Sequence, residues 1–332
     1  MLHILFKNYA KLQIWGDWMK TLAEFKEYFK DEFSTDKKMY NRGLKRAEKI
    51  ANIFRIASVT FGLLFSIVII ALAFSHFKYI YVVCVFGVII FGILLGLSFY
   101  DMFIKEDIKE RFENEDKPTL VSSILEKDFE YLQKGRIGAQ EIKDSKLLPN
   151  FDEMDGEDLV KMRCKGAVLT ANMTFSDVIL KEIVKQGDSV TSEDIYSGFF
   201  LVVDFGKNIK CDVDVNTGKM KGMNMFSTES TLFNENFEVF CKDTKTAEKL
   251  FGAGVMLAML NLKLTTGGEM KLRIRENKLY LCIDRELFSF NIEKKVEFES
   301  IRNIYDELSG IERIVREIMN RYEKNELSKK DK

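Results

Sequence analysis

The sequence IASVTFGLLFSIVIIALAFSHF at residues 56–77 is followed, after Lys78, by YIYVVCVFGVIIFGILLGLSFY at residues 79–100. Neither stretch contains Asp, Glu, Lys or Arg, and each is 22 residues long. About 20 apolar residues in a helix are enough to span the hydrocarbon core of a bilayer, which is roughly 30 Å thick. Two such stretches in succession are typical of a transmembrane helical hairpin, so we expect a multi-pass membrane protein.

Charges beside the two stretches predict the orientation of the hairpin. Basic residues crowd the segment before residue 56, whereas the turn between the spans offers only His76 and Lys78. Positively charged flanks stay in the cytoplasm and acidic residues count little. Both termini are therefore expected to be cytoplasmic. The basic residues that determine this topology and lie nearest the first span are Lys45, Arg46, Lys49 and Arg55.

Small residues recur every four positions on both predicted spans. Small side chains let helix backbones approach closely, which is how helices associate in lipid. In an antiparallel hairpin the two sets lie at matching depths, so they predict packing of one span on the other. The same stripe is also compatible with a homo-oligomer that forms through the hairpin. The residues concerned are Ser58, Gly62, Ser66, Gly92 and Gly96.

The hairpin divides the chain into five expected segments. They are an N-terminal cytosolic segment (1–55), the hairpin (56–100), a helical stalk (101–117), a cytosolic domain (118–324) and a charged, disordered tail (325–332). The large segment after the hairpin is long enough to bury a core of ordinary size.

An amphipathic helix is expected from residue 21 to residue 33 in the N-terminal segment. Thr21 and Glu24 have the spacing of a capping box, in which each side chain binds the other residue's backbone N–H. The helix either lies on the membrane or packs on the cytosolic domain. Its polar face is not basic, which favours packing on the domain. Whether translation starts at Met1 or Met19 stays open.

Apolar periodicity indicates an α+β cytosolic domain with a mainly antiparallel sheet. The strand patterns are interrupted by helical patterns without regular βαβ alternation. A continuous apolar run at residues 199–203 predicts a strand that is buried on both faces. The other expected elements are strands 159–164 and 173–180, hairpins 211–218 and 272–283, and helices 120–132, 244–262 (capped by Asp243) and 298–322.

Composition argues against most enzyme chemistries. The only histidines are His3 and His76, and one of them lies in the turn across the membrane, so a His base beside a Ser or Cys nucleophile is not expected. The five cysteines are scattered, which predicts neither a disulfide framework nor a zinc site. No phosphate-binding loop motif is present, and the net charge of −1 does not suggest nucleic-acid binding. We expect no cofactor.

One acidic cluster is a candidate site. Asp155, Glu157 and Asp158 lie close together just before a predicted strand. Carboxylates in such a group can hold a cation or act as acid and base. A solvated turn that enters a strand explains the same residues equally directly.

The order of several short motifs resembles a known family. The chain is similar to the bacterial membrane proteins of domain-of-unknown-function family 3137 over roughly residues 50 to 290. It departs from the family pattern at Phe251-Gly252-Ala253. The resemblance implies a bacterial inner membrane location and this architecture, and it brings no activity. The motifs are Asp128-Phe-Glu-Tyr131, Ile142-Lys-Asp-Ser-Lys-Leu147, Asp155-Gly-Glu-Asp158, Met173-Thr-Phe-Ser-Asp-Val178, Tyr196-Ser-Gly-Phe-Phe200, Asp204-Phe205 and Asn236-Phe-Glu-Val-Phe240.

These observations predict a membrane-tethered binding or scaffolding module. Its expected partners are the lipid bilayer and a membrane or cytosolic protein. Two alternatives stay open: a membrane-bound hydrolase that uses the clustered carboxylates and a metal, and a small transport or channel subunit. Two spans without an ionisable residue are a poor ion path, although an oligomer would be able to line a pore with Ser and Thr.

Overall fold

The computed structural model describes residues 19, 21–31, 117–125, 129–165, 169–186, 189–209, 211–218, 222–288 and 298–330, with isolated positions between residues 45 and 114. The chain divides into two compact units. The first comprises residues 1–25, 122–290 and 297–332, and it holds nearly all of the described residues. The second comprises residues 26–121 and 291–296.

Most of the sequence-predicted membrane segment lies outside the described residues. Where the structure does describe helices, none of them is both long and apolar enough to cross a bilayer. Of the predicted spans 56–77 and 79–100, and of the stalk 101–117, only isolated positions and Lys117 are described. Lys45 and Lys49 are exposed helical positions. The remaining topology and packing candidates also lie outside the described residues: Arg46, Arg55, Ser58, Gly62, Ser66, Gly92 and Gly96.

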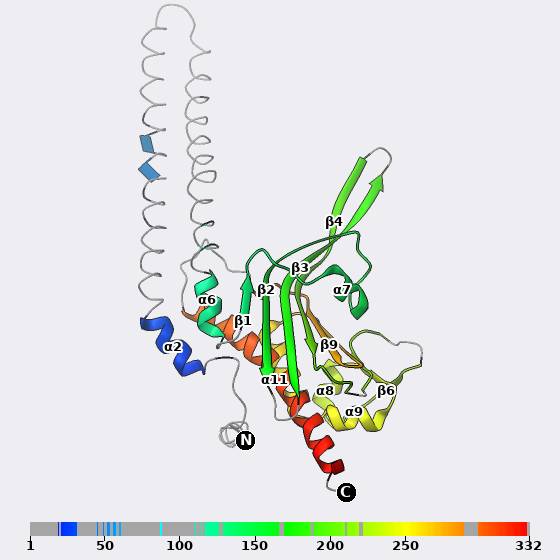
Figure 1. The fold of residues 1–332 in the computed structure, drawn as a ribbon. Coiled ribbons are helices and arrows are strands. Elements are labelled where there is room, and N and C mark those ends of the chain that lie inside the picture. The colour runs from blue at the N-terminus through cyan, green and yellow to red at the C-terminus, as the bar shows by residue number, and fades with distance from the viewer. Residues whose placement is uncertain are drawn as a thin grey trace, which may run out of the picture. The chain divides into compact units, whose positions relative to one another are not determined.

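The described strands form one nine-stranded sheet in which every neighbouring pair is antiparallel, so the predicted α+β class with a mainly antiparallel sheet is confirmed (Figure 1). The order across the sheet is β1-β2-β3-β4-β9-β8-β5-β7-β6. The strands are β1 (Phe129–Leu132), β2 (Glu153–Lys165), β3 (Thr170–Gln186), β4 (Ser189–Asp204), β5 (Val213–Val215), β6 (Asn224–Phe226), β7 (Val239–Cys241), β8 (Met270–Arg275) and β9 (Lys278–Ile283).

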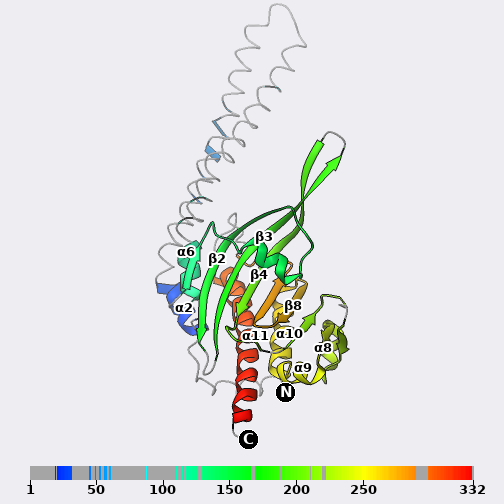
Figure 2. The same cartoon turned by 45° about the vertical axis from the view of Figure 1, so that its right-hand side comes forward.

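Helices cover both faces of this sheet. The long helix α11 crosses one face, and the short helix α7 lies over the other (Figures 1 and 2). Helix α11 is longer than the sequence predicts, because it extends into the segment expected to be a disordered tail. The helices are α2 (Leu22–Asp31), α6 (Lys117–Ile124), α7 (Ala139–Ser145), α8 (Thr231–Asn236), α9 (Thr244–Leu250), α10 (Ala253–Thr266) and α11 (Phe298–Lys330).

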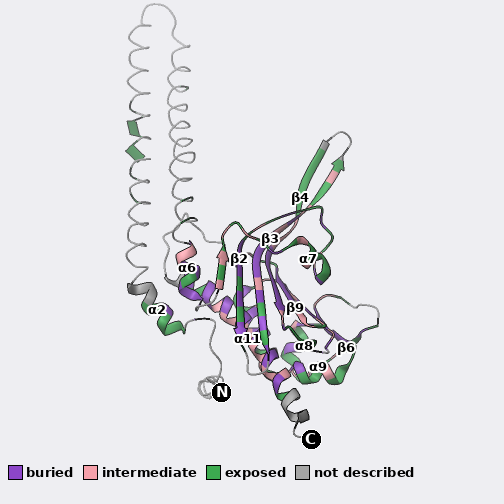
Figure 3. Cartoon of the chain, in the orientation of Figure 1, coloured by how far each residue is buried: buried purple, intermediate pink, exposed green. Residues whose placement is uncertain are grey.

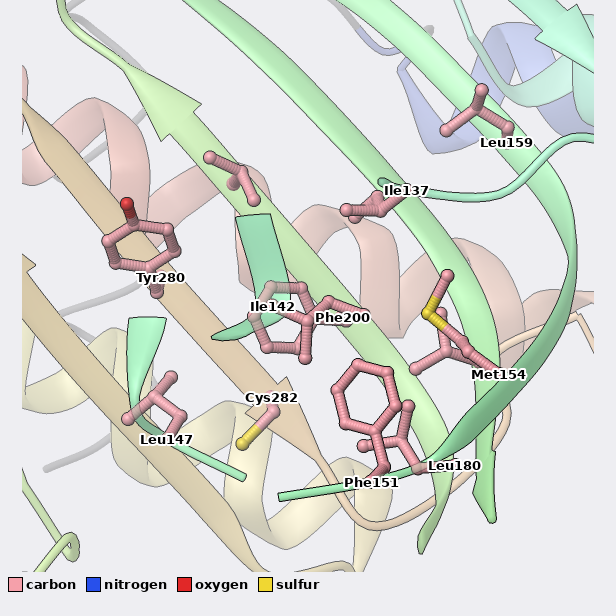
Figure 4. Packing of buried hydrophobic residues seen from close by; sticks show 12 residues of the cluster. Ile137, Ile142, Leu147, Phe151, Met154, Leu159, Leu180, Phe200, Tyr280 and Cys282 are labelled. Carbon is pink, nitrogen blue, oxygen red and sulfur yellow. The ribbon is translucent and has the colours of Figure 1, made fainter. Parts of the chain in front are cut away.

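Strand β4 is enclosed by side chains on both faces at its C-terminal end. Its residues Phe199–Val203 are all buried, which confirms the prediction from the apolar run. Successive side chains of a strand point to opposite faces. Phe200 and Val202 therefore join the cluster on the α7 face, which also contains Ile142 and Phe151 (Figure 4). On the opposite face the ring of Phe199 lies 5.6 Å from that of Phe175.

Two sequence predictions about strands are wrong. The helix expected at residues 120–132 ends at Ile124, and Phe129–Leu132 forms β1, where half-buried and exposed side chains alternate as in a strand. The hairpin expected at 211–218 does not form, because β5 pairs with β8 and β7 instead of the following strand. Strand β5 lies between β8 and β7 in the sheet, and all three of its residues are buried.

Other local predictions are confirmed. Asp243 caps α9 through its carboxylate, which accepts the Lys245 N–H at 3.1 Å, although the expected helix 244–262 is interrupted between Leu250 and Ala253. The hairpin of β8 and β9 turns at Glu276, whose φ is 52°. At the other end of the unit, Thr21 and Glu24 form the predicted capping box.

The helix that this capping box begins packs on the domain. Phe25 is fully buried, and its ring stacks on that of Tyr305 in α11 at 5.2 Å between centroids. Met19 is also buried and bridges to Leu125. These contacts favour the packed position over a position on the membrane surface for the start of α2.

A buried ion pair joins the middle of the sheet to α7. Arg273 of β8 and Asp214 of β5 are 3% and 0% exposed, and the Arg273 Nε lies 2.7 Å from the carboxylate. The Arg273 guanidinium also donates to the backbone carbonyls of Ser145 and Lys146 at 2.6 and 2.9 Å. Carbonyls at a helix C-terminus carry partial negative charge and lack partners within the helix. The Asp214 carboxylate also accepts a hydrogen bond from Arg275 Nη2 at 2.9 Å. Arg273 is thus shared between this carboxylate and the end of α7.

Replacing Arg273 with Met should lower the free energy of unfolding by about 3 kcal/mol, the lower end of the range for breaking a buried pair, because Asp214 keeps Arg275 while the carbonyls of Ser145 and Lys146 lose their donor. The matched control is Lys161→Met in the exposed pair Lys161–Glu130, whose atoms lie 3.2 Å apart. That control should change stability by less than about 1 kcal/mol. Urea unfolding of the three proteins measures both effects. Equal effects of the two substitutions would contradict the assigned role of Arg273.

Candidate functional site

Strands β3 and β4 extend far beyond the rest of the sheet. Pairing of β3 with β2 ends where Lys181 faces Glu153, and pairing of β4 with β9 begins at Phe199 opposite Ile283. Beyond these points the two strands pair with each other up to Gln186 and Ser189. We call residues 182–186 and 189–198 the arm. The arm projects from the sheet in both views, and most of its described side chains are exposed (Figures 1, 2 and 3).

Three of the short sequence motifs meet where the arm leaves the sheet. In the register of β2, β3 and β4, Gly156 lies opposite Val178, which lies opposite Gly198. The segments Asp155–Asp158, Ser176–Val178 and Tyr196–Phe200 therefore lie side by side, although they are separate in the sequence. We call the buried and half-buried polar residues at this place the polar seam: Asp158, Asp177, Tyr196, Ser197 and Glu286.

The two glycines let backbones approach closely at the seam. A Cβ atom on Gly198 would lie 2.3 Å from the Ile283 carbonyl oxygen, and one on Gly156 would lie 2.6 Å from the carbonyl oxygen of Asp177. Both distances are shorter than any real contact of a Cβ atom with backbone. The space above Gly198 is used by Tyr196, whose hydroxyl is shared between the carbonyls of Ile283 at 2.8 Å and Phe199 at 3.0 Å.

Asp177 joins the seam to the chain that follows β9. Its carboxylate accepts the backbone N–H groups of Leu287 at 2.9 Å and Phe288 at 2.8 Å. Burial raises the pKa of Asp177 from 3.8 to about 7; the two N–H groups oppose this rise, and the nearby Asp158 and Glu286 add to it. The same segment is bound again by Ser197, whose hydroxyl donates to Glu286 at 2.7 Å.

The predicted acidic cluster occupies two different environments. Asp155 is exposed, and its carboxylate binds Lys181 at 2.6 Å, which lowers the pKa of Asp155. Glu157 is also exposed. Asp158 is buried at a bulge of β2 with a φ of 61°, and it accepts a hydrogen bond from the Tyr131 hydroxyl at 2.5 Å. Asp155 is solvated and paired with Lys181, whereas Asp158 is buried and bound by Tyr131. The cluster therefore does not form one open site.

Sequence reasoning missed the polar seam except for Asp158. Asp177 carried a signal, because it interrupts the apolar alternation of Met173–Leu180 between Phe175 and Val178. Ser197 lies in one of the quoted motifs but was not singled out, and Glu286 lies in none of them; their pairing joins segments almost ninety residues apart. A charged residue at an inward position of a strand is the pattern that would have found Asp177.

The described part of the chain contains no group of three or more His, Cys, Asp or Glu residues arranged to hold a metal ion. The four cysteines within it are buried and unpaired by disulfides. Burial raises the pKa of each thiol, to about 11 for Cys164 and about 12 for Cys211 and Cys282. They therefore behave as small apolar residues.

Comparison with protein families confirms the resemblance that the motifs indicate. A family model described as a protein of unknown function (DUF3137) matches residues 194–320. This match covers the arm strand β4 from Asp194, the strands after it and most of α11. No curated protein matches the chain.

One solved structure is similar. It is described as the crystal structure of the mycobacterial trehalose monomycolate transport factor A, TtfA, with 8% sequence identity and a TM-score of 0.31. The similarity covers 60% of this chain and 96% of that one. A TM-score this low carries no argument about the fold or role of this chain.

The raised pKa of Asp177 predicts a specific dependence of stability on pH. Between pH values of about 4 and 7 the folded protein binds a proton at Asp177 that the unfolded chain does not. The contribution of Asp177 to stability is therefore fully present below about pH 4 and is lost as the pH rises to about 7, by on the order of 4 kcal/mol. In Asp177→Asn the free energy of unfolding should change less with pH between about pH 5 and pH 8.

The background in this experiment is small, since the chain has only two histidines. Burial also raises the pKa of Glu307 to about 7, although Arg285 lies 3.0 Å from its carboxylate. Glu307→Gln is therefore the control, and it should keep the share of the pH dependence that comes from Asp177. A slope in Asp177→Asn equal to that of the natural protein would refute the assignment.

A second prediction concerns Gly198. Gly198→Ala should destabilise the fold by about 1–3 kcal/mol, because its Cβ would overlap the backbone of Ile283. Gly138→Ala is the control: its φ is −64° and its Cβ would meet nothing within 4 Å, so stability should stay the same or rise slightly. Thermal unfolding compares the two, and an unchanged melting temperature in Gly198→Ala would count against close packing at the seam.

Proposed function

We propose that this chain is a non-catalytic binding or scaffolding module, tethered to the bacterial inner membrane, that presents the arm to a protein partner. The observation that carries the proposal is the arm itself. An isolated two-stranded ribbon is at best marginally stable in water. Here a ribbon continues from the buried strands β3 and β4, is fastened at its base by the polar seam and buries little of its own surface.

The placement of the carboxylates also supports a binding role. A hydrolase that uses a carboxylate pair and a metal needs those groups to face one accessible position. Asp155 instead binds Lys181 at the surface, and Asp158 lies inside the domain. The buried Asp177 has both oxygens engaged by backbone N–H groups. Each of these carboxylates has a role in holding the fold.

Tethering follows from the two uncharged stretches 56–77 and 79–100 and from the basic residues before them. With both termini in the cytoplasm, the domain would be confined to a thin layer beside the bilayer. Such confinement raises its effective concentration toward membrane partners without any new contact. A nearly balanced charge suits a domain that is held by an anchor instead of by surface electrostatics.

The test compares proteins that are crosslinked to the chain in native membranes and identified by mass spectrometry. Joining Glu182 to Glu193 by a short Asn-Gly turn removes the distal arm, and it should abolish recovery of the main partner. The double variant Asp155→Asn with Glu157→Gln should retain that partner, because neither side chain is buried. Replacing residues 56–100 with an unrelated two-span anchor of the same topology should also retain it.

Three outcomes would contradict the proposal. Unchanged partner recovery without the distal arm would exclude the arm as the binding element. Loss of a hydrolytic activity in the folded carboxylate variant would favour the enzyme alternative. Ion flux in liposomes that disappears with the exchanged anchor would favour the channel alternative.

A further inference from the structure

The two edges of the arm differ in how they are protected. The backbone N–H of Ile183 on β3 donates to the carboxylate of Asp152 at 2.9 Å, and the Asp152 N–H donates to the Lys181 carbonyl at 2.9 Å. Residue Asp152 therefore covers the start of the outer β3 edge. Edge strands are commonly protected from pairing in this way.

Among the residues that the structure describes, none binds the backbone of β4 in this way along its outer edge between Val190 and Asp194. Ile183 lies opposite Ser192, and facing residues in an antiparallel pair either exchange both hydrogen bonds or neither. Because the Ile183 N–H points away from β4, the N–H and C=O of Ser192 point away from β3. The same alternation turns Val190 and Asp194 outward, since they face Lys185 and Lys181.

The outer edge of β4 has no neighbouring strand on the N-terminal side of Phe199, because β9 ends there. Phe199 still donates its N–H to the Arg285 carbonyl at 3.0 Å, after which Leu287 and Phe288 turn to Asp177. An added strand on the arm would thus continue the position of β9 in the sheet. Addition of an extended segment to a free edge is a common mode of peptide recognition.

The two faces of the arm specify the chemistry of that segment. On one face Glu182 lies directly opposite Glu193, and both are exposed. Neither carboxylate has an ion-pair partner among the described residues, and like charges in facing positions disfavour pairing. On the other face Ile183 is 37% and Val190 is 64% exposed, and the same face carries Lys181, Lys185, Ser192 and Asp194.

A second copy of this chain fits the edge poorly. From Ser189 to Ser197 the charged residues of β4 are Glu193 and Asp194. Two β4 edges brought together would add two carboxylates from each copy, and neither β4 segment contributes a basic residue.

We propose that the outer edge of β4 between Val190 and Asp194 binds an extended protein segment in which basic and apolar residues alternate. Its backbone pairs with Val190, Ser192 and Asp194. Its basic side chains lie beside Glu193, with Glu182 one strand further away, and its apolar side chains lie beside Val190, with Ile183 one strand further away. This inference rests on the proposed function, because it names the chemistry of the partner that the arm receives.

The probe is a synthetic heptapeptide in which lysine and valine alternate, and its binding to the purified full chain is measured by calorimetry. A peptide that alternates glutamate and valine should bind on the order of tenfold more weakly or not at all. Glu193→Lys should weaken the lysine peptide by a similar factor. Affinity for the lysine peptide should also fall with added salt.

Two proline variants identify the edge. Ser192→Pro removes an N–H on the outer edge of β4, and Lys185→Pro removes one on the outer edge of β3. Proline is tolerated on an edge strand where its missing N–H faces solvent, so both arms should still fold, as circular dichroism can verify. Ser192→Pro should reduce peptide affinity at least about tenfold, because a backbone hydrogen bond is lost and the ring blocks the edge. Lys185→Pro should leave affinity unchanged.

Equal binding of the two peptides, loss of binding only in Lys185→Pro, or no binding of the lysine peptide would each overturn this inference. None of these results decides whether the arm binds a partner in native membranes. If deletion of the distal arm still removes the crosslinked partner, the proposed function stands and only the assigned chemistry fails.

Discussion

One strand has to satisfy two opposite environments, and the rest of the domain is arranged around this constraint. From Phe199 to Val203, β4 lies in the middle of the sheet with side chains buried on both faces, whereas its exposed first half belongs to the arm. The change occurs at Gly198, where Ile283 approaches too closely for any side chain. Both halves of β4 pair with β3 in antiparallel orientation. The hydrogen bonds of Asp177, Tyr196 and Ser197 hold the strands in place where this change occurs.

The α+β class and several elements could be predicted because their signals are local. The run at 199–203, the caps at Thr21 and Asp243 and the turn at Glu276 each depend on neighbouring residues. The predicted hairpin at 211–218 failed for the opposite reason. Its alternation and turn residues resemble a hairpin, yet β5 binds strands that come much later in the chain. Sequence periodicity identifies a strand without identifying its partner.

Less of the candidate site could be predicted, because its residues are brought together by the pairing register of β2, β3 and β4. Asp155, Glu157 and Asp158 are adjacent in the sequence, and a bulge sends one of them inward while the others face solvent. Asp177 and Glu286 join them only through pairing across the sheet and the turn after β9. The Arg273–Asp214 pair likewise forms because β5 lies beside β8 in the sheet. Buried charges of this kind are visible only once the strand order is known.

The pairing of β3 and β4 with their neighbours at the base of the arm determines how the arm would transmit force. Tension applied along the arm would be carried by hydrogen bonds of β4 to β9 and of β3 to β2, which lie across the direction of the pull. These bonds are loaded in shear, so they resist together instead of opening one after another from the end. With roughly 3.3 Å per residue, the arm also acts as a lever of about 20–30 Å. A displacement at its tip would therefore be passed to the sheet as a mechanical load, without any unfolding of the arm.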